Sequence, residues 1–294
     1  MFSLGNKTKA MMKNDIKVFG LFGYPLSHSV SPEMHNAALR AARISGMYFA
    51  FERKKNDFLH LIRSKRRMIL DGFNLTIPYK ELILPYVDQL DPAAKLAGAV
   101  NTVLRTGNRW IGYNTDIDGF LAGTRSVRFN PRGKKAVVLG AGGAARAVVA
   151  ALSIARVRQI GIFNRTVRKG SLLAREFKRK FPRITIKNIR DQKEAARELE
   201  TADVLVNATS VGLHKSQSSP IPVSLLPTRK ILVYDLIYRP KETKLLKAAK
   251  RRGHRALNGE MMLLHQGARA FEIWTKRKAP VLIMQRALQH ALMV

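Results

Sequence analysis

A lysine and an aspartate are the residues of this sequence best suited to move a proton. Lys80 follows a proline turn at the expected end of a strand, and Asp116 follows the end of a later strand. Ligand crevices in α/β proteins form at the ends of strands, so the two side chains are candidates for one site. An aspartate that holds an ammonium group and sets its pKa forms a proton-transfer pair for interconverting a carbonyl and an alcohol. A Lys–Asp pair is more often a structural ion pair, and spacing alone leaves both interpretations open.

Hydrogen-bonding side chains gather in the segments around this pair. The loop 23–32 places three serines and His28 between an expected strand and an expected helix, and Asn101 lies at another strand end. Such a set can donate several hydrogen bonds to a carboxylate or a polyol. Ser31 is more simply the N-cap of the helix, with Pro32 at its first position, and His28 more simply stabilises the loop.

The clearest motif is a glycine-rich turn, Gly-Ala-Gly-Gly-Ala-Ala at residues 140–145. It follows a buried strand and opens a helix, with the spacing G-x-G-x-x-A of dinucleotide-binding folds. The glycines let the backbone turn tightly and approach a pyrophosphate, while the helix start supplies free N–H groups and a positive dipole end. Glycine turns also occur as plain strand-to-helix connections, but this context favours dinucleotide binding.

The residues after the next strand indicate which dinucleotide binds. That strand ends in Asn164-Arg165-Thr166, with Arg168 and Lys169 close behind. A domain that selects NAD usually has an acidic residue here to accept from the ribose 2′-hydroxyl. A guanidinium instead pairs with a 2′-phosphate. We therefore expect NADP; the alternative is that Arg168 or Lys169 is an ordinary solvated charge.

Short apolar strands alternate with amphipathic helical segments along the whole chain, which is typical of α/β architecture with mainly parallel sheets. In the first half we expect strands at 16–23, 48–52, 72–76, 99–105 and 109–113, and helices at 32–43, 58–66 and 91–97. In the second half we expect strands at 136–139, 159–163, 184–186, 204–207, 231–235 and 255–257, and helices at 144–155, 169–181, 243–252, 260–274 and 281–292. The stretch 212–227 is expected to be a loop.

The chain is strongly basic. It has 294 residues, 46% of them apolar, which suffices for two domains with real cores. Its formal charge is +33, and residues 121–257 carry most of the excess. There is no zinc-ligand spacing, RNA-stacking motif or long basic tail, so we expect no specific nucleic-acid partner. We attribute the surplus charge to a surface bias that speeds the capture of anionic ligands.

The sequence contains no cysteine. This excludes disulfides, thiolate metal sites and a cysteine nucleophile, and it fits a reducing compartment. Residues 1–15 have three lysines but no apolar run, so we expect a flexible tail and not a secretory signal. No stretch of about 18 uncharged apolar residues exists, so no membrane span is expected. The expectation is a cytoplasmic protein without a metal.

Taken together, the motifs resemble those of the shikimate dehydrogenase family. The resemblance runs from about Val18 to Thr275. It rests on nine segments in the family's order: 23–32 with His35-Asn36 after it, 74–80, 98–102, 112–119, 140–145, 164–166, 207–212, 234–235 and 258–266. Each segment alone is modest, but nine in register are highly specific.

The resemblance implies a reversible, NADPH-dependent reduction of 3-dehydroshikimate to shikimate, in the pathway to chorismate and the aromatic amino acids. It implies that Lys80 and Asp116 are the catalytic pair, with Lys80 donating a proton to the alkoxide while NADPH delivers hydride. The implied substrate-binding residues are Ser27, Ser29, Thr76, Lys80, Asn101, Asp116, Tyr238 and Gln266. The implied cofactor-binding residues are Gly140, Ala141, Gly142, Gly143, Ala144, Asn164, Arg165, Thr166, Lys169, Ile237 and Gly259.

The resemblance also implies a domain organisation. Residues 1–120 would form an αβα substrate domain with a mainly parallel sheet, and 121–257 a Rossmann-type NADP-binding domain. Residues 258–294 would form helices that return to the first domain. The implied partner is a small-molecule substrate, and the chain would be a monomer or a homodimer.

The chain departs from the family's usual pattern in one segment, and one other activity competes with the implied one. The family usually has Gly-Leu-Gly or Gly-Met-Gly where this chain has Gly259-Glu260-Met261-Met262, and Glu260 would serve only the helix dipole. The competing enzyme is a quinate/shikimate dehydrogenase that uses NAD. That branch typically carries an acidic residue after the second Rossmann strand, and Asn164-Arg165-Thr166 argues against it.

Overall fold

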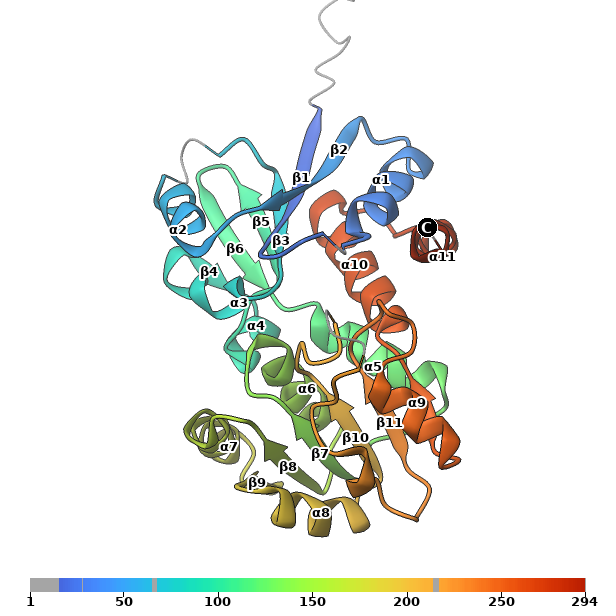
Figure 1. Cartoon of the computed structure of the whole chain (residues 1–294). Coiled ribbons are helices and arrows are strands. Elements are labelled where there is room, and N and C mark those ends of the chain that lie inside the picture. The colour runs from blue at the N-terminus through green and yellow to red at the C-terminus, as the bar shows by residue number, and fades with distance from the viewer. Residues whose placement is uncertain (1–15, 28, 65–67, 214–216, 294) are drawn as a thin grey trace, which may run out of the picture.

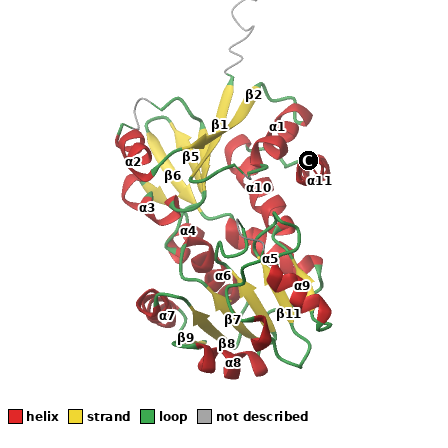
Figure 2. Cartoon of the chain, in the orientation of Figure 1, coloured by secondary structure: helices red, strands yellow, loops and turns green. Residues whose placement is uncertain are grey.

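The computed structural model describes residues 16–27, 29–64, 68–213 and 217–293. Within these ranges the chain forms two α/β bodies, each built on one six-stranded sheet (Figure 1, Figure 2). This confirms the two-domain α/β fold that the sequence predicts. The expected tail, residues 1–15, and His28 lie outside the described residues.

The first sheet has the strand order β2-β1-β3-β5-β6-β4. Its strands are β1 (Lys17–Gly23), β2 (Gly46–Glu52), β3 (Gly72–Leu75), β4 (Gln89–Leu90), β5 (Thr102–Thr106) and β6 (Arg109–Tyr113). β1 is parallel to β2 and β3, and β4 to β6, whereas β5 is antiparallel to both of its neighbours. The helices of this body are α1 (Ser31–Ala41), α2 (Lys55–Arg63), α3 (Tyr79–Leu82) and α4 (Pro92–Ala97).

The second sheet has the order β12-β11-β10-β7-β8-β9 and is parallel throughout. Its strands are β7 (Lys135–Leu139), β8 (Gln159–Phe163), β9 (Thr185–Ile189), β10 (Val204–Asn207), β11 (Leu232–Asp235) and β12 (Arg255–Leu257). Its helices are α6 (Gly143–Ile154), α7 (Val167–Lys180), α8 (Gln192–Glu200) and α9 (Lys244–Arg251). The strand order reverses between β7 and β10, and ligands of α/β folds bind beyond the carboxyl ends of the strands at such a point.

Two long helices run side by side between the two bodies (Figure 1). They are α5 (Asp116–Ser126) and α10 (Glu260–Thr275), and α11 (Val281–Met293) follows them and packs on α1. The close approach of α5 and α10 needs glycine at 119, since a Cβ there would lie 2.6 Å from the carbonyl oxygen of Met262. Trp274 in α10 donates from Nε1 to the carbonyl of Val103 in β5, at 2.9 Å. The C-terminal helices therefore return to the first sheet.

The expected boundary between residues 120 and 121 falls inside α5, which packs against α10 and α6. Within the ranges described above, none of the helices is both long enough and apolar enough to cross a bilayer.

Helical periodicity missed three helices, α3, α5 and α8. α3 has only four residues, and α5 begins within a polar motif. α8 carried a signal that could have found it: Asp191 accepts from the N–H of Glu194 (2.7 Å), and the Glu194 carboxylate accepts from the N–H of Arg190 (2.9 Å). This arrangement resembles a capping box, which marks a helix start, except that the second bond comes from Arg190, the residue before the cap.

The prediction that Ser31 is an N-cap is wrong. Ser31 is already the first helical residue of α1, and Val30 occupies the cap position without a capping side chain. The nearby hydroxyl that does accept a backbone N–H is that of Ser29, from Ser31 at 3.4 Å. A residue with helical backbone angles is no longer placed to accept from the N–H groups of its own first turn.

Asp235, at the carboxyl end of β11, ties three segments of the second body together. Its buried carboxylate accepts from Asn207 Nδ2 (2.9 Å), Thr243 Oγ1 (2.7 Å) and the N–H of Ile237 (3.1 Å). Thr243 also caps α9 by accepting from the N–H of Leu246. Burial raises the pKa of Asp235 to about 6, although the three donors oppose this effect.

We expect Asp235 to make the protein less stable as pH rises through about 6. Its pKa in the folded state lies above the ordinary value of an aspartate, 3.8, so protonation favours folding. The stabilisation is complete below the lower pKa and is lost above the higher one. A shift of this size corresponds to about 3 kcal/mol.

Urea unfolding of the wild type and of Asp235→Asn across this pH range measures the effect. The difference between the two proteins cancels the other carboxylates, and the wild type should gain stability relative to the variant as pH falls. A difference that stays constant with pH would contradict the prediction.

Candidate active site

A cavity of about 280 Å³ lies between the two bodies. The first body, the second body and α10 all contribute to its walls, so that segments far apart in the sequence meet in one place. Of the residues predicted for the site, ten line this cavity: Ser29, Thr76, Lys80, Asn101, Asp116, Ala144, Ile237, Tyr238, Gly259 and Gln266.

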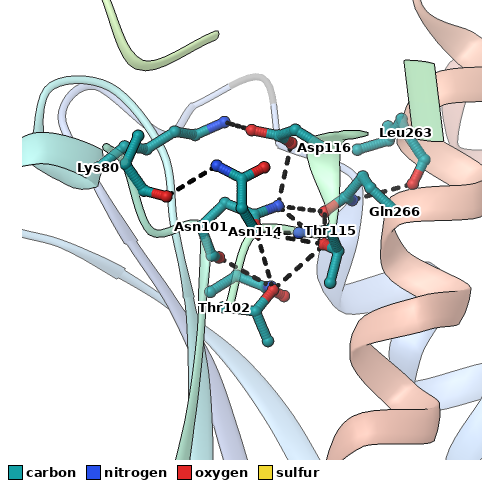
Figure 3. Close-up of polar contacts among 10 residues, drawn as sticks. Lys80, Asn101, Thr102, Asn114, Thr115, Asp116, Leu263 and Gln266 are labelled. Atoms are coloured by element: carbon teal, nitrogen blue, oxygen red, sulfur yellow. Dashed lines mark hydrogen bonds and ion pairs between the residues drawn. The ribbon is translucent and has the colours of Figure 1, made fainter. Parts of the chain in front are cut away.

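The centre of the site is an ion pair between Lys80 and Asp116 (Figure 3). Lys80 Nζ lies 2.6 Å from Asp116 Oδ2, and the side chains are only 14% and 5% exposed. Lys80 belongs to α3, directly after the end of β3, and Asp116 is the first residue of α5. The positive end of the α5 dipole favours a carboxylate at this position. The arrangement presents one ammonium group to the cavity, held by a buried carboxylate.

Asn101 connects this pair to the rest of the site (Figure 3). Its Nδ2 lies 2.9 Å from Asp116 Oδ1, 2.9 Å from Thr115 Oγ1 and 3.2 Å from Gln266 Oε1. Its Oδ1 accepts from the backbone N–H of Thr115 at 2.7 Å. Both oxygens of Asp116 are thus bonded, one to Asn101 and one to Lys80, and Gln266 brings α10 into the same network.

A second layer of buried polar residues lies behind Asn101, and sequence reasoning gave none of them a role in the site. Tyr48 donates from its hydroxyl to Asn74 Oδ1 (2.8 Å), and Asn74 Nδ2 donates to Thr102 Oγ1 (2.9 Å) and to the carbonyl of Asn101 (3.1 Å). Asn74 also lines the cavity. The signal that could have found it is an amide in the otherwise apolar, fully buried strand β3.

The other predicted substrate residues have different positions. Thr76 and Ser29 line the cavity from the two loops that follow β3 and β1. Tyr238, which follows β11 of the second body, lines the same cavity and packs against the core of the first body. Burial raises its pKa to about 12, so its hydroxyl is a neutral donor at pH 7. Ser27 is exposed and does not line the cavity.

The glycine turn leads into the same cavity from the second body. Gly140 has a φ of 112°, which favours glycine, and Gly142 has open space where a Cβ would project. No side chain caps the first turn of α6, so the first backbone N–H groups of this helix are left without a capping side chain. Ala144 lines the cavity, and Thr209 and Ser210 after β10 line it as well. These two hydroxyls were missed, although they belong to a segment that carries the resemblance.

Exposed cationic side chains follow the end of β8. Arg165, Thr166 and Lys169 are exposed there, and Asn164 Nδ2 donates to the carbonyl of Thr166 at 2.9 Å. These residues lie outside the cavity wall. Since β8 neighbours β7, a ligand that extends from the cavity along the glycine turn would arrive at this cluster.

Two cavity residues, Ile237 and Gly259, lie in the segments between β11 and α10. The N–H of Gly259 donates to the carbonyl of Ile237 (3.0 Å), and a Cβ at 259 would lie only 2.0 Å from the carbonyl of Leu236. Glycine is therefore required here by the close approach of two backbones.

Glu260 is in the first turn of α10, where its carboxylate suits the dipole and accepts from Gln289 Nε2 at 3.2 Å.

The geometry fits a reaction that moves one proton beside a bound dinucleotide. The described part of the chain has no cluster of three or more His, Asp or Glu side chains that could hold a metal ion.

Three family models match this chain. Residues 21–103 match the shikimate dehydrogenase substrate binding domain, residues 124–234 match shikimate/quinate 5-dehydrogenase, and residues 259–289 match the shikimate 5′-dehydrogenase C-terminal domain.

Curated relatives are similar in sequence to this chain along nearly its whole length. The shikimate dehydrogenase (NADP(+)) of Moorella thermoacetica is 41% identical over 283 residues, which covers 96% of this chain and 95% of the relative. That of Methanopyrus kandleri is 41% identical over 279 residues, covering 94% of this chain and 96% of the relative.

Solved structures show the same fold. Shikimate 5-dehydrogenase of Thermus thermophilus, in complex with NADP(H) and shikimate, superposes with a TM-score of 0.83 at 37% identity, covering 94% of this chain and all of the other. Quinate dehydrogenase of Corynebacterium glutamicum, in complex with NAD, has a TM-score of 0.83 at 30% identity, covering 94% of this chain and 99% of the other. The family models and the full-length relatives together show that this chain belongs to the shikimate dehydrogenase family.

Proposed function

We propose that this chain is an NADP-dependent shikimate dehydrogenase, which reversibly reduces 3-dehydroshikimate to shikimate. One observation carries the proposal: the buried Lys80–Asp116 pair and the uncapped start of α6 face the same cavity. A proton donor on one wall and a dinucleotide turn on the other are the two parts that a ketone reductase needs. Relatives named as shikimate dehydrogenases support the choice of substrate.

The chain's own residues fit the cofactor. Residues 140–144 would hold the pyrophosphate, since the turn has a left-handed glycine, an open glycine and free N–H groups. Arg165, Thr166 and Lys169, together with Asn164, would hold the 2′-phosphate, and Ile237 and Gly259 would lie near the nicotinamide. When bound, NADPH supplies the hydride for the carbonyl carbon.

The residues of the first body would bind the substrate and move the proton. Lys80 donates a proton to the oxygen of the reacting carbonyl, which stabilises the negative charge that develops in the transition state. Asp116 orients the ammonium, and Asn101 fixes Asp116 through the 2.9 Å hydrogen bond.

The remaining substrate contacts belong to two groups in this proposal. Ser27, Ser29 and Tyr238 would bind the carboxylate, while Thr76, Asn101 and Gln266 would bind ring hydroxyls. Ser27 would have to turn toward the cavity, since its side chain is exposed in this structure.

The alternatives have weaker support. A quinate/shikimate dehydrogenase that uses NAD would be expected to carry an acidic residue after β8, where this chain has Asn164-Arg165-Thr166. The proposal further includes a cytoplasmic location, a monomer or a homodimer, and no specific partner among nucleic acids or membranes.

Removing either member of the Lys–Asp pair should slow turnover strongly. We expect Lys80→Met and Asp116→Asn to lower kcat by roughly 100- to 10,000-fold, which is the usual contribution of a positioned acid or base. The assay is reduction of NADP⁺ with shikimate, and Lys193→Met, at an exposed lysine of α8, is the matched control. Variants that retain wild-type turnover, or a wild type that binds NADP⁺ without oxidising shikimate, would refute the proposed activity.

Arg165 should control the choice of cofactor. We expect Arg165→Asp to weaken NADP⁺ binding by roughly 10- to 100-fold and to leave NAD⁺ binding nearly unchanged, because only the 2′-phosphate loses a charge-assisted hydrogen bond. Fluorescence titration of both nucleotides measures this. Arg158→Asp is the control, since Arg158 is exposed just before the opposite end of the same strand. Equal losses for the two nucleotides would contradict the assignment.

A further inference from the structure

Three charged residues of the second body hold the end of a helix in the first body. They are Arg146, Glu176 and Lys180, and we call this cluster the grip. Arg146 in α6 donates from Nε to the carbonyl of Ala97 at 2.7 Å, and its Nη2 lies 2.6 Å from both carboxylate oxygens of Glu176 in α7. Lys180 donates from Nζ to the carbonyl of Leu96 at 2.8 Å and to Glu176 Oε1 at 2.7 Å. The two carbonyls are the last ones of α4, so the grip holds a helix C-terminus.

The chemistry of this grip favours a rigid arrangement. The C-terminus of a helix carries partial negative charge and attracts cations. Burial alone would raise the pKa of Glu176, but hydrogen bonds from Lys180 and Arg146 outweigh it and hold the pKa below its usual value. The Arg146 side chain is only 14% exposed, so the contact is partly shielded from water and salt.

The residue after α4 is adapted to the arginine. Gly98 has a φ of 62°, and a Cβ there would lie 2.3 Å from the Arg146 guanidinium. A larger residue would therefore be strained and would also displace the arginine. The chain then continues directly into the site, where the N–H of Val100 donates to the carbonyl of Lys80 at 2.8 Å and Asn101 bonds Asp116.

Helix α6 touches the catalytic side of the first body at a second point. A Cβ on Gly143, in its first turn, would lie 2.7 Å from the Cβ of Lys80, so the lysine stem packs directly on the glycine turn. The same helix thus contacts Lys80 at its start and the end of α4 one turn later. The short stretch 98–101 leads from the end of α4 to Asn101, which bonds Asp116.

We propose that Arg146, held by Glu176, is a positioning residue that fixes the Lys80–Asn101 edge of the site against the cofactor turn. The proposal rests on the proposed function, because it concerns the proton-donating side of that same site. Without the grip, the end of α4 can shift relative to α6, and Lys80 loses its fixed place beside the reacting oxygen. Misplacement by about 1 Å can cost a catalyst on the order of 100-fold in rate.

The test compares Arg146→Met, Arg146→Lys and Glu176→Gln with the wild type. We expect Arg146→Met and Glu176→Gln to lower kcat by roughly 10- to 100-fold and to change the KM for shikimate and the Kd for NADP⁺ by less than about threefold. Arg146→Lys should recover thermal stability better than turnover, because an ammonium group cannot bond one carbonyl and two carboxylate oxygens in the planar geometry of a guanidinium. Arg175→Met is the control, since Arg175 is exposed on α7 next to Glu176.

Amide hydrogen exchange provides a readout that does not depend on activity. We expect Arg146→Met to speed exchange at Val100 and Asn101 by roughly tenfold or more. Both residues belong to the stretch that follows α4, and their N–H groups donate to the carbonyls of Lys80 and Tyr113, bonds that open when this stretch moves. The amides of α8, remote from the grip, serve as the internal control.

The outcomes separate the two proposals. An active wild type whose Arg146→Met and Glu176→Gln variants keep kcat within about twofold overturns the positioning role, whatever happens to the melting temperature. An equal loss in Arg175→Met also overturns it. An inactive wild type overturns the proposed function. In that case, unchanged exchange at Val100 and Asn101 in Arg146→Met would also overturn the proposal that Arg146 fixes this segment.

Discussion

The buried ion pair between Lys80 and Asp116 is the constraint on which the rest of the site depends, because both charged groups need hydrogen-bond partners. Two charges taken out of water are tolerated only when their remaining hydrogen-bonding capacity is satisfied. The structure satisfies Asp116 with Lys80 on one oxygen and Asn101 on the other, and places the carboxylate at the start of α5. The ammonium group of Lys80 is therefore stabilised although it is largely buried, and it lines the cavity where a ligand can reach it.

The geometry of the two bodies follows from bringing four distant segments to this pair. Lys80, Asn101 and Asp116 come from strand ends of the first sheet, and Gln266 comes from a helix that starts beside the second sheet. The close packing of α5 on α10 at Gly119 makes that crossing possible. The glycine turn packs against the stem of Lys80, so the two bodies meet beside the pair. They are joined through helices and not through either sheet.

Only a few of the many cationic side chains of this chain have a specific partner or a proposed ligand. Arg165 and Lys169 are exposed after β8 and are the cations that we propose for a 2′-phosphate, and Arg146 and Lys180 bond the end of α4. These few cations account for a small part of the +33 charge. Much of the remainder lies on exposed helix faces such as that of α7, where it acts through the field of the whole surface and is screened by salt.

The sequence by itself determined the fold class, the strands of the parallel sheet, the glycine turn and the main candidates for the site, because these depend on local period, on glycine spacing and on motifs. It did not find α3, which is too short for a period, and it placed the cap of α1 on Ser31, one residue inside the helix. Only the tertiary structure decided that Asn74 supports Asn101 from behind and that Arg146 grips α4. Both contacts join segments about 25 to 50 residues apart, and no local pattern records which distant carbonyl or amide a polar side chain will meet.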